Sequence, residues 1–507
     1  MKLNLLILSS FIPLICLSQD ITYSESGYPI SAIAAFKIIG KINENFLVYN
    51  YIQDKTVISV YNNKMKLLSS QEIEFFKVKN TVSVDLVAYS TFFMIIFQTI
   101  ENNTFYCKAA KINDTGKLID EVKMVDSMPA EMMQGTGLYL VTTSENKKFI
   151  LLNRPLWGLE EHKLQMDQIT LDVDLTIKKK DHYFIPFLLN RQFISNASID
   201  NQGNVLFMTW GVLNGNKSNL VIYKSPALEP DLVIRYLTIN KYGLKDPQIK
   251  IDNRKNNYYV TSFLRTIKKH HIKGLLSLVV KPDLSDYLKP EVALLSEQDI
   301  KLANKKISVY QSINNYSLGD FYLKKDGSYV ITATLNRGIS NISDYQQKVG
   351  TARKNALENE PVARPNEKHP FLFKLAESQV PVNYRGTAPL SPLKANVMTF
   401  SFDQGNHLAD VNSLSIFLPQ ADLTYYSTAI IGNQVLFLFN NVDNKNRRYL
   451  NNFSVFHDGS TMLNLSFKNL DNACLFLPDM GQQVEEKAFI IPCIKNDRLL
   501  MAEITFE

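Results

Sequence analysis

Short runs of alternating apolar and polar residues recur along the chain, separated by turns rich in Asn, Asp and Gly. Residues 198–207 show this unit, with a turn at 200–204 between two apolar runs. Alternation with a period of two predicts half-buried β-strands, and Gly and Asn accept the positive φ that a tight hairpin turn requires. Similar turns occur around residues 114, 326, 404 and 458. The pattern therefore predicts an all-β chain of antiparallel hairpins.

The spacing of these hairpins predicts how they are arranged. The turns before the most apolar strands are centred near residues 43, 90, 145, 201, 254, 326, 432 and 483, and five of the seven steps span 47 to 56 residues. That length fits one four-stranded blade of a β-propeller. We therefore predict a single propeller of eight four-stranded blades over residues 19–507, with seven blades as the fallback. A pair of β-sandwiches is the alternative, because it would show the same hairpins without a common period.

The last repeat offers only three strands, at about 474–479, 487–493 and 497–506. A closed propeller leaves no unpaired strand within its ring, so residues 20–30 are expected to supply the missing strand. The N-terminal and C-terminal strands should then lie side by side.

Two segments interrupt the pattern and are expected to project from one blade. Residues 336–368 are polar and lack alternation, whereas residues 376–394 contain Pro381, Pro389 and Pro392 and have the composition of a loop. Long surface insertions often carry function. The segment 336–368, with its mixed charges, is the expected partner-binding surface, and a solvated loop without a partner is the alternative.

The N-terminus has the composition of a secretory signal peptide over residues 1–18. One lysine precedes an apolar run that ends at Leu17, and the small Ser18 precedes Gln19. The run is shorter than the roughly 20 residues of a membrane span. Cleavage after Ser18 would export the chain to the periplasm, the cell surface or the exterior. Lipidation of Cys16 is the alternative, although a small residue would then be expected in place of Ile15.

Composition narrows the function classes only slightly. The 45% of hydrophobic residues can form a large core, and 29 Phe and 24 Tyr favour strands over helices. The formal net charge of +6 is small and spread along the chain, which gives no support for nucleic-acid binding. No segment after the leader is long and apolar enough to predict a membrane span.

Three cysteines, Cys107, Cys474 and Cys493, remain after the leader, so the chain is not a disulfide scaffold. Cys474 and Cys493 flank the final predicted hairpin. A turn centred between residues 483 and 484 would place them directly opposite each other, at about the separation of a disulfide. They are candidates for a disulfide, and two buried thiols are the alternative.

Several C-terminal segments have a further similarity, namely Tyr316–Val330, Val435–Asn441 and Asn496–Phe506. Together with the leader, they resemble a group of uncharacterised exported β-propeller-like proteins of Bacteroidetes-type bacteria. The resemblance covers roughly residues 310–507. It implies export and the propeller fold, and it implies no activity.

Few side chains are candidates for chemistry. Asp85 and Asp320 are carboxylates within otherwise apolar strands, so they either line a central channel as catalytic groups or face solvent. His270 and His271 are adjacent, and neighbouring residues of a strand point to opposite faces, so a solvated hairpin end is favoured over a metal site. No metal-ligand spacing, phosphate loop, dinucleotide fingerprint or nucleophile elbow occurs, so no cofactor or metal is predicted.

These observations favour an exported, non-enzymatic binding or scaffold protein. It would be a monomer that holds a protein or glycan partner of the cell envelope on the propeller rim and the inserted loops. The alternative is a carbohydrate-active hydrolase or lyase with its site at the mouth of the central channel, where carboxylates from different blades would converge. Trp157 and Trp210 either stack on sugars or pack between blades.

Overall fold

The structure is a computed structural model that describes residues 19–506 apart from some gaps. The gaps are residues 26, 54, 76–79, 131–137, 158–161, 189–191, 213–216, 286–289, 304–312, 336–392, 419–425, 443–447, 457–458 and 465–466. The predicted leader and the insertion at 336–368 therefore lie outside the described residues. Of the segment 376–394, only Leu393 and Lys394 are described, and they begin a strand rather than continue a loop.

Most of the described chain forms strands, and seven sheets are each built from consecutive antiparallel strands. The first three sheets contain β3 (Ile33–Ile42), β4 (Asn45–Ile52), β5 (Lys55–Tyr61) and β6 (Leu67–Glu72); β7 (Thr81–Ala88), β8 (Phe92–Glu101), β9 (Thr104–Asn113) and β10 (Lys123–Pro129); and β11 (Leu140–Thr143), β12 (Phe149–Trp157), β13 (Lys163–Asp172) and β14 (Ile177–Pro186).

The next four sheets continue this order. They contain β15 (Gln192–Ile194), β16 (Ser198–Ile199), β17 (Val205–Val212), β18 (Lys217–Ser225) and β19 (Val233–Asn240); β20 (Tyr242–Asp252), β21 (Asn257–Thr266), β22 (Ile272–Val280) and β23 (Glu291–Leu294); β24 (Tyr316–Leu323), β25 (Tyr329–Leu335), β26 (Leu393–Phe402) and β27 (Leu408–Leu418); and β28 (Ser427–Ile431), β29 (Gln434–Val442), β30 (Arg448–Val455) and β31 (Thr461–Asn464). A short helix, α1 (Glu297–Ala303), follows β23.

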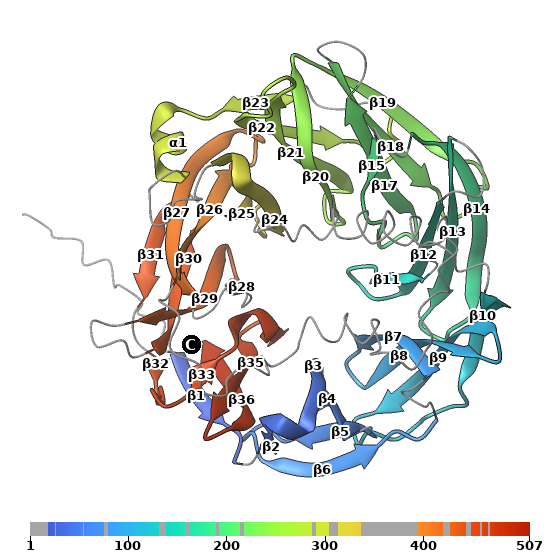
Figure 1. The fold of residues 1–507 in the computed structure, drawn as a ribbon, viewed down its shortest axis with the longest axis vertical. Helices are drawn as coiled ribbons and strands as arrows, with labels where there is room; N and C mark the ends of the chain where they lie inside the picture. Colours follow the sequence, from blue (N-terminus) through green and yellow to red (C-terminus); the bar gives the residue numbers. More distant parts are fainter. Residues whose placement is uncertain are drawn as a thin grey trace, which may run out of the picture.

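A further sheet joins strands from both ends of the described chain. It contains β1 (Gln19–Tyr23), β2 (Tyr28–Pro29), β32 (Phe467–Lys468), β33 (Leu475–Phe476), β34 (Gln482–Glu485), β35 (Ala488–Lys495) and β36 (Arg498–Phe506). β1 is antiparallel to β36, from the pair Gln19 and Phe506 to the pair Tyr23 and Ala502. In Figure 1 the blue strand β1 accordingly lies among the red strands near the C-terminus.

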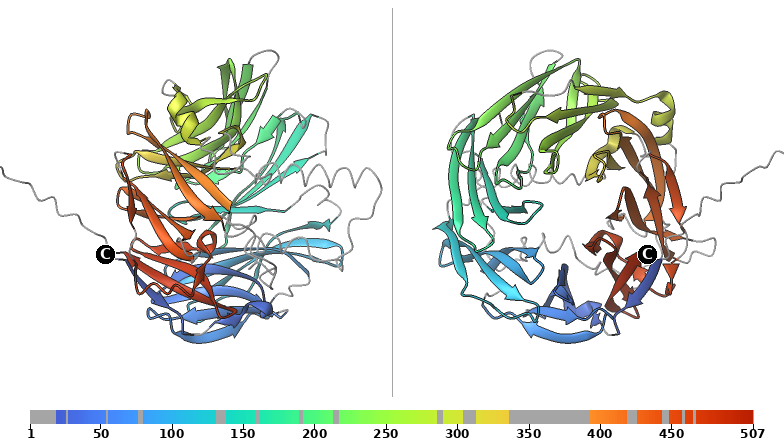
Figure 2. Two further views of the ribbon diagram at one scale, coloured as in Figure 1. Left: turned by 60° about the vertical axis from the view of Figure 1, so that its left-hand side comes forward. Right: turned by 180° about the vertical axis from the view of Figure 1, so that it is seen from behind.

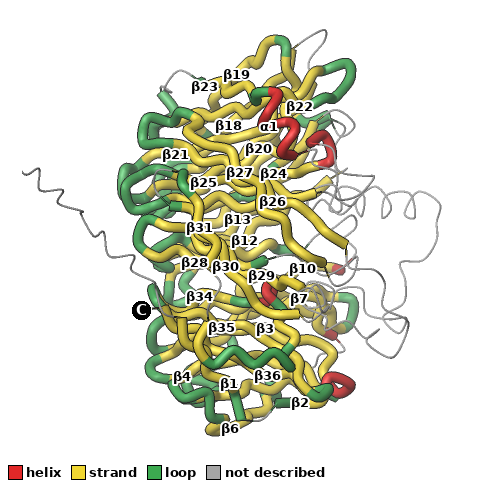
Figure 3. Tube along the Cα trace, turned by 90° about the vertical axis from the view of Figure 1, so that its left-hand side faces the viewer, coloured by secondary structure: helices red, strands yellow, loops and turns green. Residues whose placement is uncertain are grey.

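The sheets stand around a common axis as the blades of a β-propeller. The strands β3, β7, β11, β20, β24 and β28 lie toward this axis, and β6, β10, β14, β19, β23 and β31 lie on the perimeter (Figures 1 and 2). Figure 3 views the ring from its side, where strands make up most of its wall. The predicted all-β propeller with four-stranded blades is confirmed, and the chain does not adopt a pair of sandwiches.

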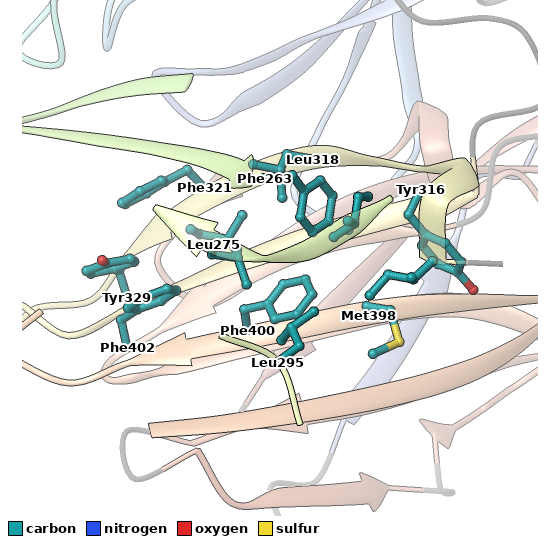
Figure 4. Packing of buried hydrophobic residues seen from close by; sticks show 14 of the residues in the cluster. Phe263, Leu275, Leu295, Tyr316, Leu318, Phe321, Tyr329, Met398, Phe400 and Phe402 are labelled. Atoms are coloured by element: carbon teal, nitrogen blue, oxygen red, sulfur yellow. The ribbon is translucent and has the colours of Figure 1, made fainter. Parts of the chain in front are cut away.

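The core is divided into clusters that lie between neighbouring sheets. The cluster in Figure 4 joins the sheet of β20–β23 to the sheet of β24–β27. Tyr329 stacks between Phe321 and Phe402, with ring centroids 4.7 Å away on each side. Apolar side chains from two sheets thus interlock, as the alternating sequence requires. No described helix is long and apolar enough to cross a membrane.

Candidate ligand-binding site

Two β-bulges lie side by side on the axial strands of adjacent sheets. In β20 the pairing with β21 shifts between Lys245 and Gln248, and in β24 the pairing with β25 shifts between Leu318 and Phe321. A bulge leaves residues outside the ladder and redirects their side chains. Among the described residues, Asp246 (φ 53°) is the only non-glycine residue with positive φ inside a strand. Both bulges therefore present polar side chains where a regular strand would not.

The bulges of β20 and β24 are tied together by side chains that reach across from one strand to the other. Lys245 Nζ donates to the carbonyl oxygens of Asn314 and Tyr316, at 3.0 and 2.5 Å. Gln248 Nε2 donates to the carbonyls of Leu318, at 3.1 Å, and Gly319. These carbonyls lie in the turn before β24, at its first residue and in its bulge, so the two strands hold each other in place although no ladder joins them.

Asp246 is a largely buried carboxyl between two cationic side chains. Burial raises the pKa of Asp246, and this effect outweighs the charges of Lys245 and Arg265 and the hydrogen bonds from the Ser317 side chain and the Leu318 amide. Burial likewise lowers the pKa of Lys245 and of Arg265. Asp246 Oδ2 and Arg265 Nε have no hydrogen-bond partner within the described part of the chain. The bulge of β20 and the neighbouring Arg265 thus bring three ionisable side chains together. Two of their polar atoms lack a hydrogen-bond partner among the described residues.

Asp320, a residue that the sequence singled out, lies in the bulge of β24 and begins a chain of hydrogen bonds toward β28. Tyr322 Oη donates to Asp320 Oδ2 at 2.7 Å, and Thr428 Oγ1 donates to Tyr322 Oη at 2.7 Å. Tyr426 Oη donates to Thr332 Oγ1 at 2.9 Å, and the same oxygen accepts the Asp320 amide at 2.9 Å. The carboxylate of Asp320 is therefore joined to Tyr322 and, through it, to Thr428, while the amide of Asp320 is joined to Thr332 and, through it, to Tyr426.

Both phenols of this chain remain protonated. Burial is the main cause that raises the pKa of Tyr322, and the nearby Tyr426 and Asp320 raise it further. Burial also raises the pKa of Tyr426, with Asp320 acting in the same direction. A phenol with a raised pKa stays protonated, so it can donate a hydrogen bond but cannot act as a general base near neutral pH.

Gly319 allows these groups to approach each other. A Cβ added at this position would lie 2.7 Å from Thr332 Oγ1 and 3.6 Å from Tyr426 Oη. Real Cβ atoms do not come that close to an oxygen, so any larger residue would displace the hydroxyl that links Tyr426 to the bulge. We refer to Lys245, Asp246, Gln248, Arg265, Asp320, Tyr322, Tyr426 and Thr428 as the polar belt.

The second predicted carboxylate does not join this site. Asp85 lies on β7, on the far side of the ring from β24 (Figure 1), and Ser83 Oγ donates to it at 3.3 Å. Asp246 was not among the predicted site residues. Pro247 beside it interrupts a strand pattern, which is a signal of a bulge. Tyr426 was not among them either, and no local pattern identifies it.

The remaining candidates lie in other parts of the ring. His270 and His271 are exposed in the hairpin turn between β21 and β22. Trp210 is buried and stacks on Phe193 at 5.7 Å, whereas the side chain of Trp157 is outside the described part. None of these residues contributes to the polar belt.

The cysteine register predicted from the sequence is wrong. Cys493 pairs with Phe476, so Cys474 lies two residues away along the ladder rather than opposite it. Both are free, buried thiols.

Comparison with known proteins does not assign the chain to a family. No family model and no curated protein matches the chain. Among solved structures, the WD40 domain of SCAP from fission yeast is 8% identical, with a TM-score of 0.39 and coverage of 95% of this chain and 98% of that one. The polysaccharide lyase Uly1 is 9% identical (TM-score 0.40, coverage 86% and 93%). Prolyl oligopeptidase B from Galerina marginata is 9% identical (TM-score 0.41), and the match covers 91% of this chain and 56% of the peptidase.

Proposed function

We propose that the protein is an exported, monomeric, non-enzymatic binding propeller whose polar belt holds a polyhydroxylated, glycan-type ligand. One observation carries this proposal: three axial strands, β20, β24 and β28, bring carboxyl, amide, amine and hydroxyl groups together at adjoining positions. Sugars are recognised by such alternating donors and acceptors. The proposal also takes the strands of both chain ends as the closing element of an eight-bladed ring.

The protonation of the belt supports binding over catalysis. A lyase needs a base, and the raised pKa values of Tyr322 and Tyr426 make their phenols unsuitable for that role. Their oxygens are already engaged with Asp320, Thr332 and Thr428, as expected of a preformed binding surface.

A hydrolase is the second candidate, and one observation favours it. Asp246 and Asp320 lie in the two adjoining bulges, and burial raises the pKa of Asp246. A carboxyl with a raised pKa beside a second carboxylate is the arrangement of a glycosidase acid and its partner.

Calorimetric titration of residues 19–507 with a panel of neutral and acidic oligosaccharides tests the proposal. The informative variant is Tyr322→Phe, which removes only the hydroxyl between Asp320 and Thr428. Its matched control is Tyr236→Phe on β19, because Tyr236 is exposed on the perimeter. We expect Tyr322→Phe to weaken binding about tenfold, because Asp320 and Thr428 lose the hydroxyl that positions them, and the control to bind normally.

Two results would count against the proposal. Equal affinities for Tyr322→Phe and Tyr236→Phe would remove the belt as the site. Release of new reducing ends that is abolished by both Asp246→Asn and Asp320→Asn would establish the hydrolase instead. Export is tested separately, because the intact mass of the secreted protein should correspond to a chain that begins at Gln19.

A further inference from the structure

Two thiols meet in the sheet where both ends of the chain come together. Cys474 lies just before β33, where its amide donates to the carbonyl of Asp471 at 3.1 Å, and Cys493 lies within β35. The thiol of Cys493 forms a hydrogen bond with Cys474. Both residues are free cysteines. The third described cysteine, Cys107, is fully buried in β9 and belongs to a different core cluster.

Only one of the two cysteines borders a pocket. A pocket of about 330 Å³ opens beside Cys474, and Cys493 does not line it. Its wall includes Tyr23, Glu25, Asp471, Lys495 and Arg498. Cys474 keeps 3% of its surface exposed and Cys493 none. Of the pair, Cys474 therefore borders the pocket and Cys493 does not.

The surroundings of the two thiols shift their pKa values in opposite directions. The hydrogen bond from Cys493 is the main cause that lowers the pKa of Cys474, and the charge of Lys495 acts in the same direction, against burial and the carboxylate of Asp471. Lys495 Nζ is itself held by Asp471 Oδ2 at 2.6 Å. The same thiol–thiol bond and burial raise the pKa of Cys493 well above its ordinary value. Reactive cysteines have a lowered pKa, a nearby cation and access to solvent.

We propose that Cys474 and Cys493 form a thiol–disulfide exchange site, at which Cys474 reacts with an incoming low-molecular-weight disulfide and Cys493 resolves the product. The Cys474 thiolate attacks one sulfur of the disulfide, and a mixed disulfide forms while one thiolate leaves and takes up a proton. Cys493 then loses its proton to water and attacks the Cys474 sulfur, and the second thiol leaves. The protein loses two electrons and two protons, and the incoming disulfide is reduced to two thiols.

The probe is glutathione disulfide, mixed with glutathione in a series of ratios and applied to residues 19–507. After acid quenching, free thiols are alkylated and peptides are identified by mass spectrometry. We expect a Cys474–Cys493 disulfide to form while Cys107 remains alkylated throughout. In Cys493→Ser the reaction should stop at a glutathione adduct on Cys474, and Cys474→Ser should form neither product. Cys107→Ser is the matched control and should behave like the unaltered chain.

The rate of alkylation of the unaltered, reduced protein tests the same assignment without a substitution that could disturb folding. Cys474 should be alkylated at least about tenfold faster than Cys493 and Cys107, because its thiolate is favoured and it borders the pocket. Equal rates for the three thiols would overturn the proposal. So would a glutathione adduct on Cys493 in Cys474→Ser, or the absence of a disulfide at every ratio.

Discussion

The buried ion pair of Arg154 and Asp167 offers a quantitative test of the structure. The two residues are directly opposite on β12 and β13, and their side chains are only 7% and 2% exposed. Arg154 Nε donates to Asp167 Oδ2 at 3.1 Å, and the guanidinium lies 4.8 Å from the centre of the Tyr139 ring. Gln165 Nε2 and His182 Nδ1 each lie 2.7 Å from Asp167 Oδ1. The carboxylate is therefore fully engaged.

Asp167→Asn keeps the shape of the side chain and removes its charge, which leaves the Arg154 guanidinium buried without a counter-ion. Breaking a buried pair in this way costs about 3–5 kcal/mol. Arg154→Met should cost a similar amount, because it strands the carboxylate. The double variant Arg154→Met/Asp167→Leu should cost less than the sum of its own single variants, Arg154→Met and Asp167→Leu, by about 2–3 kcal/mol, because well-packed apolar residues can replace an ion pair.

Urea unfolding of residues 19–507, followed by circular dichroism, measures these differences. Glu486→Gln is the control, because the ion pair of Lys325 and Glu486 is 65% exposed on both sides and solvent screens it. We expect no measurable change there. A loss below about 1 kcal/mol in Asp167→Asn, or additive losses in the double variant, would refute the reasoning.

The same pair predicts how stability depends on pH. Burial alone would raise the pKa of Asp167, but hydrogen bonds from Gln165, His182 and Arg154 outweigh it, so the pKa lies below its ordinary value. A lowered pKa contributes stability that is present above the unfolded-state pKa of roughly 3.9 and is lost as the pH falls through the folded-state value. The gap between the unaltered protein and Asp167→Asn should therefore be constant at neutral pH and should close below about pH 4.

Three further substitutions test the belt, the core and the closing sheet. Gly319→Ala should displace the Thr332 hydroxyl, lower the free energy of unfolding by about 1–3 kcal/mol and weaken oligosaccharide binding, as measured by urea unfolding and calorimetry. Tyr329→Phe should cost about 1–3 kcal/mol in urea unfolding, because the fully buried hydroxyl lies 2.6 Å from Asn406 Oδ1. Ile21→Ala in β1 should cost about 2–5 kcal/mol, seen as a lower thermal midpoint, since Ile21 is only 3% exposed against β36.

The fold could be predicted from the sequence because its signals are local. In the hairpin of residues 198–207, Asp200 Oδ1 accepts the amides of Gln202 and Asn204 at 2.9 and 2.8 Å, and Gly203 has a φ of 90°. Each such turn fixes two strands without help from distant residues. The period of 47 to 56 residues follows from repeating this unit within each sheet.

The candidate site could be predicted only in part, because its contacts are not local. Gln248 bonds to carbonyls 70 and 71 residues away, and Tyr426 bonds to Thr332 across 94 residues. The cysteine register failed for a different reason. The segment between Cys474 and Cys493 is not a simple hairpin, because a 3-10 turn at Pro478–Met480 and the strand β34 intervene. The pairing with β35 therefore turns at residues 485–488, later than the midpoint of the two cysteines.

The polar belt includes a strand residue whose backbone departs from the local rules that built the rest of the described ring. Asp246 occupies a conformation that other non-glycine residues of the described chain adopt only outside strands, and it does so beside Pro247. A residue held in that conformation costs about 1–3 kcal/mol, and an incompletely bonded buried carboxyl adds to the cost. A regular strand would avoid both costs. Stability alone gives no reason to keep two adjoining bulges on these axial strands, whereas the proposed ligand-binding function would require the side chains that the bulges redirect.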